Sequence, residues 1–169
     1  MTIESMRDLF DISLRHAYDC EQKLVKKGLP TMAKSSTSSE LRNAFEQHLE
    51  ETRTHVTRLE RVFSLLGAEA KKEDNDILDE MTDEAEDMIK NIDASPLRDA
   101  ALVVGGNQVE HYEMALYGSL VAFARQLGLP EAARLLEETL NEEKAADAKL
   151  TAIGENSVNP IASGTRRAA

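Results

Sequence analysis

Four long stretches of the chain repeat apolar residues every three or four positions, and this period restricts the fold more than any other feature. In residues 3–27 the repeat includes Phe10, Leu14 and Leu24, and in residues 39–66 it includes Phe45 and Leu59. Such spacing places the apolar side chains on one face of an α-helix. Ala, Leu, Glu and Lys favour helices, and no long β-branched run competes with them. The chain is therefore predicted to be all-α.

Breaks in this pattern define five predicted helices, which cover about residues 3–27, 39–66, 77–92, 96–127 and 131–153. Gly28 and Pro30 are an expected stop for the first helix. Ser38 or Ser39 is an expected N-cap for the second, and Ser95 for the fourth. The positions expected to face the core include Met6 in the first helix and Ile77, Met81, Met88 and Ile92 in the short one.

The order of these helices predicts a four-helix bundle. Helix pairs with short loops pack antiparallel, and the long connection between the second and third long helices acts as a crossover that carries the short extra helix. A length of 169 residues suits one domain. The bundle is expected over residues 1–158, followed by a flexible C-terminal tail over residues 159–169.

Charge and composition exclude several classes of partner. The net charge of −11 argues against a surface for nucleic acid or for an anionic membrane. No apolar run approaches the roughly 20 residues of a membrane span, and no signal peptide opens the chain. Cys20 is the only cysteine, so an internal disulfide cannot form. We expect a cytoplasmic protein without nucleic-acid or membrane partners.

Several ionisable residues fall on the predicted apolar faces. At 100° per residue, they are Glu21 in the first long helix, His48 and His55 with Glu51 at the edge in the second, Glu110 and Glu113 in the third, and Glu143 and Asp147 in the last. Each long helix thus contributes at least one acid near its middle. Burying carboxylates together costs several kcal/mol per ion unless they are protonated or neutralised.

Two divalent metal ions are the natural counter-charge for such a cluster. Di-iron and di-manganese bundles use one Glu from each of two helices and Glu-x-x-His from the other two. Here there is no Glu-x-x-His; the second helix offers His48-x-x-Glu51 or Glu51-x-x-x-His55, and the last offers Glu143-x-x-x-Asp147. An oxygen-rich site suits iron or manganese better than copper.

Other interpretations stay open for individual residues. A buried His48 or His55 is more often a hydrogen-bonded core residue than a ligand, and the sequence does not decide between the two. Glu113 can instead pair with Arg or Lys of a neighbouring helix, and Asp147 can pair with a lysine on the helix surface.

Four segments together resemble the YciE/YciF stress-protein family of ferritin-like proteins, over residues 3 to about 158. They are "DISLRHAYDCEQKL", "HLEETRTHVTRLE", "RDAALVVGGNQVEHYEMALYGSL" and "LLEETLNEEKAADAKLTAI". The resemblance implies a ferritin-like, rubrerythrin-like bundle, a homodimer and a dinuclear metal centre.

The resemblance also implies a set of metal ligands, whose positions here are Glu21, His48, Glu51, Glu110, Glu113, Glu143 and Asp147. The cofactor is expected to be two divalent ions, iron first and manganese second. A redox role would be oxidation of Fe(II) or reduction of peroxide or dioxygen. It would need an external electron donor, because the Cys-x-x-Cys pairs of a rubredoxin module are missing. The alternative is a structural or iron-sequestering dimer without catalysis.

Overall fold

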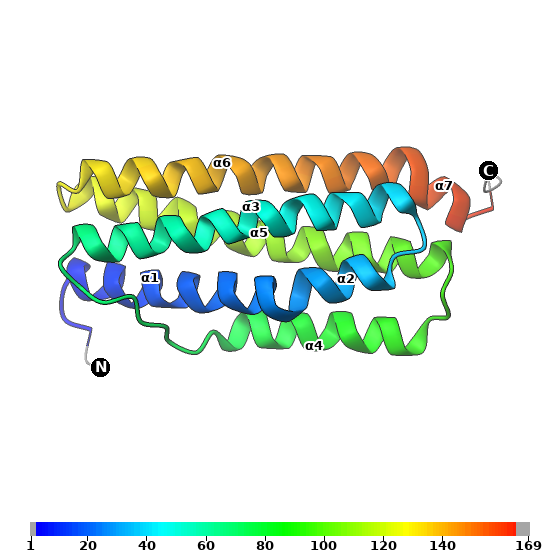
Figure 1. The fold of residues 1–169 in the computed structure, drawn as a ribbon, viewed down its shortest axis with the longest axis horizontal. Coiled ribbons are helices and arrows are strands. Elements are labelled where there is room, and N and C mark those ends of the chain that lie inside the picture. Colours follow the sequence, from blue (N-terminus) through cyan, green and yellow to red (C-terminus); the bar gives the residue numbers. More distant parts are fainter. Residues whose placement is uncertain (1–2, 165–169) are drawn as a thin grey trace.

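Four long helices run side by side along the length of the molecule (Figure 1). They are α1 (Met6–Lys23), α3 (Ser39–Leu65), α5 (Pro96–Gln126) and α6 (Pro130–Ile153). The computed structural model describes residues 3–164, and within that range it contains no strand. None of the helices in this range is both long and apolar enough to cross a membrane. The predicted all-α four-helix bundle is confirmed.

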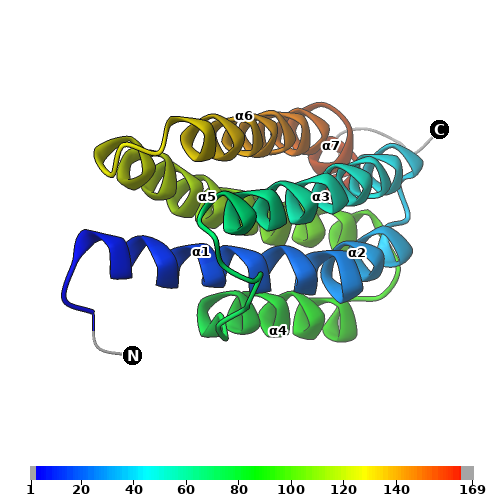
Figure 2. The ribbon, with the colours of Figure 1, turned by 60° about the vertical axis from the view of Figure 1, so that its left-hand side comes forward.

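The crossover helix α4 (Asp76–Asn91) lies outside the bundle, alongside α1 (Figures 1 and 2), and also packs on α5. Its buried residue is Leu78, and Met81 and Ile89 are partly buried beside it. Of the expected inward positions, Met81 and Ile92 are partly buried, while Ile77 and Met88 are exposed and their neighbours Leu78 and Ile89 face inward instead. The predicted face was therefore right in part, with a shift of about one position at Ile77 and Met88.

Tertiary contacts explain this rotation of α4. Asn75 caps the helix and also donates its backbone N–H to Asp19 of α1, while Asp79 pairs with Lys23 of α1. These contacts hold α4 in one orientation on α1. The apolar period of a single helix cannot predict them.

The first helix does not stop at Gly28. A π-helical turn (η1, Leu24–Gly28) leads directly into α2 (Leu29–Ser35), so the chain stays helical to Ser35. Pro30 falls in the first turn of α2, where its missing N–H does little harm. The expected stop was therefore wrong, because the wider turn accommodates both residues. At the other end, Met6 was expected inward but is exposed, since it starts the helix.

The chain also remains helical beyond Gly154, where an irregular tail was expected. A second π turn (η2, Gly154–Val158) and a short helix α7 (Asn159–Ala162) follow α6, and Val158 is buried. The helical segments correct that expectation as far as Ala162. The domain boundary at residue 158 stays a prediction, and residues 165–169 of the predicted tail lie outside the described residues.

Two apolar clusters divide the bundle along its length. One contains Leu24, Phe45, Val109 and Leu150, and the other contains Leu14, Leu59, Tyr117 and Leu136, each with further residues of all four long helices. In α3, α5 and α6 the ionisable positions singled out above lie between residues of the two clusters, and in α1 Glu21 lies directly after Tyr18 and Cys20, which belong to one cluster each. The fold thus encloses a polar layer between two apolar cores.

Asp99 in the first turn of α5 fastens the linker between α2 and α3. Its carboxylate accepts the backbone N–H of Thr37 at 2.7 Å and that of Ser38 at 2.9 Å, and it also accepts the Thr37 hydroxyl. The side chain is buried. Hydrogen bonds to a buried carboxylate are among the stronger ones in proteins.

We expect Asp99→Ala to destabilise the chain by about 1–3 kcal/mol, because it removes the charged acceptor of the Thr37 and Ser38 N–H groups and leaves a space where the buried carboxylate was. Chemical denaturation monitored by circular dichroism measures the change. Asp76→Ala is the matched control, since Asp76 is an exposed acid in the first turn of α4. Equal losses in the two variants would contradict the role of the Asp99 clamp.

Candidate metal centre

Six ionisable side chains occupy the polar layer between the two apolar cores. They are Glu21 from α1, His48 and His55 from α3, Glu110 and Glu113 from α5, and Glu143 from α6, and all six are buried. His48 and His55 lie on the same inward face of α3 because seven residues make about two helical turns. Glu110 and Glu113 are neighbours because they lie three residues apart on one face.

The inward atoms form two groups that share one residue. Atoms of His48, Glu110, Glu113 and Glu143 lie within 4.8 Å of one another, as do atoms of Glu21, His55 and Glu143. His48 Nε2 is 3.3 Å from Glu110 Oε1 and 3.5 Å from Glu143 Oε2. His55 Nδ1 is 3.0 Å from Glu143 Oε1 and 3.4 Å from Glu21 Oε1. Glu143 therefore stands between two clusters of donor atoms.

Many of these inward atoms lack a hydrogen-bond partner in spite of their proximity. Within residues 3–164, the buried unpartnered atoms include Glu21 Oε2, His55 Nδ1, Glu110 Oε2, Glu113 Oε2 and both carboxylate oxygens of Glu143. Buried polar atoms are normally hydrogen-bonded, and exceptions require an explanation. Donor atoms that converge without hydrogen bonds to one another suit the binding of a cation better than a closed hydrogen-bond network.

In each histidine, the ring nitrogen that faces away from the buried acids contacts a more exposed glutamate. His48 Nδ1 lies 3.3 Å from Glu51 Oε2, and His55 Nε2 lies 2.9 Å from Glu142 Oε2. Arg58 donates two further bonds to the Glu142 carboxylate. A carboxylate on the outer nitrogen orients the ring and leaves the inner nitrogen free to bind a metal.

Two further side chains contact the buried acids. Tyr117 donates its hydroxyl to Glu21 Oε1, and the thiol of Cys20 lies 3.5 Å from Glu113 Oε1. Both groups are buried, and burial together with the nearby carboxylates raises the pKa of each well above its usual value. The Tyr117 hydroxyl and the Cys20 thiol therefore act as neutral donors.

Burial dominates the electrostatics of the acids. It raises the pKa of Glu110 to about 8 and that of Glu143 to about 7, and it raises the pKa of Glu113 well above its usual value. Burial alone would lower the pKa of His55, but the charges of Glu21 and Glu143 outweigh it and raise the pKa to about 11. Without cations, the layer thus holds protons that a metal would displace.

The structure brings together most, but not all, of the residues in the predicted set. Glu21, His48, Glu110, Glu113 and Glu143 meet in the layer. Glu51 stands at its edge, on the outer nitrogen of His48, with its side chain 36% exposed. Asp147 belongs to neither group, and its Oδ1 atom lies 3.2 Å from His111 Nε2.

Three contacts escaped the sequence reasoning. His55 was left open, although its position two turns after His48 on the apolar face was a usable signal. Cys20 was considered only as a disulfide partner, and Glu142 was not among the inward positions. Their contacts with Glu113 and His55 depend on how the helices pack, so the period of a single helix could not reveal them.

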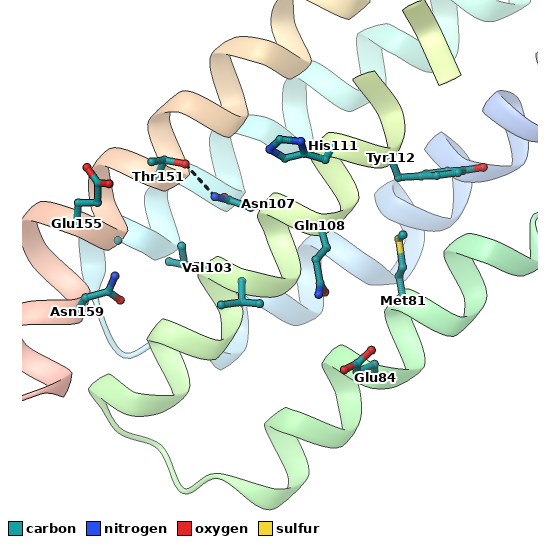
Figure 3. A pocket seen from close by; sticks show the side chains of 12 residues that line it. Met81, Glu84, Val103, Asn107, Gln108, His111, Tyr112, Thr151, Glu155 and Asn159 are labelled. Atoms are coloured by element: carbon teal, nitrogen blue, oxygen red, sulfur yellow. Dashed lines mark hydrogen bonds between the residues drawn. The ribbon is translucent and has the colours of Figure 1, made fainter. Parts of the chain in front are cut away.

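A wider groove of about 790 Å³ lies away from this layer, between α4, α5 and the end of α6. His111 and Tyr112 are among its lining residues, and Figure 3 shows that its acids, Glu84 and Glu155, stand apart from His111. Asn107 donates to Thr151 across it at 2.9 Å. The groove therefore offers no convergent donors comparable to those of the buried layer.

Known proteins are similar to this chain in both sequence and fold. Protein YciF of Escherichia coli strain K12 is 38% identical over 160 residues, which cover 94% of this chain and 96% of that protein. The crystal structure of the E. coli stress protein YciF matches with a TM-score of 0.88 at 37% identity, covering 93% of this chain and 99% of that one.

Two other solved structures extend the comparison. YcfI from Rhodopseudomonas palustris matches with a TM-score of 0.84 at 39% identity, over 88% of this chain and 94% of that one. A protein from Xanthomonas campestris shares the fold alone, with a TM-score of 0.74 at 23% identity over 95% and 99% of the two chains.

A family model described as a domain of unknown function, DUF892, matches residues 5–163. That span contains every helix of the bundle and every residue of the buried layer. Together with the likeness to YciF, which confirms the resemblance seen in the sequence, it shows that the chain belongs to the DUF892 family.

Proposed function

We propose that this chain binds two divalent metal ions in the buried layer, with Glu21, His48, His55, Glu110, Glu113 and Glu143 as ligands. The observation that carries the proposal is the set of converging donor atoms that lack hydrogen-bond partners. Four carboxylates bring four negative charges, which two divalent cations balance. Glu143, common to both groups, is the residue suited to contact both ions.

The donor set supports iron first and manganese second. Four carboxylates and two imidazoles are the same inventory that di-iron and di-manganese bundles use. Their distribution differs, since α3 supplies both histidines and α5 supplies two glutamates. Hard oxygen donors suit these metals better than Cu(I), which selects soft sulfur ligands.

We further propose a redox function, the oxidation of Fe(II) or the reduction of peroxide or dioxygen. The bound ions would supply one-electron chemistry toward such oxidants. The chain's own residues would exclude bulk water through the two apolar cores and hold the carboxylates in place through Tyr117 and Cys20. Electrons would come from an external donor, and the family resemblance supports a homodimer as the working unit.

Metal loading tests the site directly. We expect about two Fe(II) ions per chain under anaerobic conditions, and below about half an ion in the double variant Glu110→Gln, Glu143→Gln, because ligand loss in both groups weakens binding. Elemental analysis after gel filtration measures the content.

Exposed acids give the matched control for this loading. The double variant Glu80→Gln, Glu131→Gln makes the same charge change on the surface and should retain wild-type loading. Unchanged metal content in the Glu110, Glu143 variant would contradict the proposed site.

Proton linkage gives a second test. An acid whose pKa is higher in the folded chain than in the unfolded one takes up protons on folding, so its contribution to stability falls as pH rises. For Glu110 and Glu143 the window runs from 4.5 to about 8 and about 7, respectively. His55 acts in the same direction from 6.5 to about 11.

We therefore expect the Tm of the metal-free chain to fall between about pH 5 and pH 8, and less steeply in the double variant Glu110→Gln, Glu143→Gln. The metal-loaded chain should not show this fall, because cations replace the protons. Differential scanning calorimetry across this range measures both. Equal slopes for the wild type and the variant would show that these acids do not titrate as buried groups.

Reaction with peroxide tests the redox step. We expect the Fe(II)-loaded chain to consume added peroxide at least about tenfold faster than Fe(II) in buffer, with a rise in near-ultraviolet absorbance as Fe(III) forms. Stopped-flow spectroscopy follows the reaction, and repeated additions with a reductant test turnover. Slow oxidation in a single turnover with retained metal would favour the sequestering alternative, and no acceleration at all would exclude the redox function.

A further inference from the structure

A small cavity between α3 and α6 connects the buried layer with the surface. Its volume is about 20 Å³, enough for one particle of the size of water. Its lining includes His48 and Glu110 on the inner side and Glu51 and Lys149 on the outer side. Because the inner pair is buried while Glu51 and Lys149 reach solvent, the cavity marks a path to the layer.

A chain of polar contacts follows the same path. Lys149 Nζ donates to Gln47 Oε1 at 2.6 Å, and Gln47 Nε2 donates to Glu51 Oε1 at 2.8 Å. The other oxygen of Glu51 contacts His48, which in turn faces Glu110. Glu110 Oε2, at the inner end, is buried without a hydrogen-bond partner. A cation in the cavity would have the carboxylate of Glu51 on its outer side and that of Glu110 on its inner side.

On the side of His55, the contacts that separate the buried layer from solvent are stronger. The outer glutamate of His55, Glu142, is held by two bonds from the guanidinium of Arg58, which also donates to Thr139. Such bidentate ion pairs are stronger and more rigid than a single amide hydrogen bond. Glu51, by contrast, is held on the outside by the neutral side chain of Gln47. Opening the layer therefore costs less at Glu51.

The walls of the cavity are consistent with passage of a small ion. Ala44 of α3 and Ala146 of α6 contribute small side chains to its lining, and Phe45 and Leu150 form the apolar remainder of the wall. The substitution Ala146→Leu would fill the cavity.

We propose that divalent cations enter the buried layer between α3 and α6, with Glu51 as the first carboxylate on the path and Lys149, held by Gln47, as a positively charged gate. This inference rests on the proposed metal site and adds the route and its control. The gate would discourage cations by charge, and rotation of the Lys149 side chain away from Gln47 would admit them.

Uptake kinetics test the route. Co²⁺ is mixed with metal-free protein in a stopped-flow instrument, and visible absorption reports its binding. We expect Lys149→Gln to speed uptake by about three- to tenfold and Glu51→Gln to slow it by a similar factor, because each changes the charge on the path. Ala146→Leu should also slow uptake, with circular dichroism confirming that it folds.

Matched controls lie on the same helices. Lys144→Gln and Glu50→Gln make the same charge changes at exposed positions that do not line the cavity, and should leave the rate within about twofold of the wild type. Rates in the three path variants that match those of the controls would overturn the route while leaving the metal site intact. A wild-type chain that takes up no Co²⁺ would overturn the proposed site and the route with it.

Discussion

Four carboxylates share a dry interior in this molecule, and the rest of the structure follows from how that charge is accommodated. Among the described residues, only His48 and His55 offer a positive charge within ion-pair distance of Glu21, Glu110 or Glu143. Two imidazoles cannot neutralise four acids, so protons or cations must do so. The pKa values of the acids are raised in part because too little positive charge lies near them, and the proposed pair of metal ions would supply that charge.

The bundle provides the setting that such a cluster needs. One apolar cluster lies on each side of the layer, and each long helix crosses both. The acids are thus held by packing above and below, while their own mutual repulsion would separate them. The linker clamp at Asp99 and the α4 anchor at Asn75 tie the connections to the bundle at two further points. Rigid support of this kind keeps donor atoms in place before a cation arrives.

Sequence reasoning recovered the elements that depend on local pattern. The four long helices, the serine caps at Ser38 and Ser95, and most of the inward acids follow from a period of 3.6 and from capping chemistry. The inward face of α4 was only partly predicted, because two neighbouring apolar stripes fit the same helical period. Tertiary contacts with α1 and α5 determine which stripe is buried. Glu142 could not be found, because its partner His55 lies 87 residues away in sequence.

The π turn Leu24–Gly28 has a consequence for how the chain can vary. Buried residues Leu24 and Leu29 are five positions apart, a spacing that an uninterrupted α-helix would turn by about 140° out of line. The wider turn absorbs that phase difference just after Glu21, so Leu29, Met32 and Ala33 return to the interior. Deleting one residue there would convert the wider turn into an ordinary α turn, with the equivalents of Leu24 and Leu29 four positions apart, and would keep α2 in phase while leaving Glu21 where it is. A change of one residue in length at this joint can therefore be accommodated by exchange between a π turn and an α turn, with the acid and the distal packing both kept.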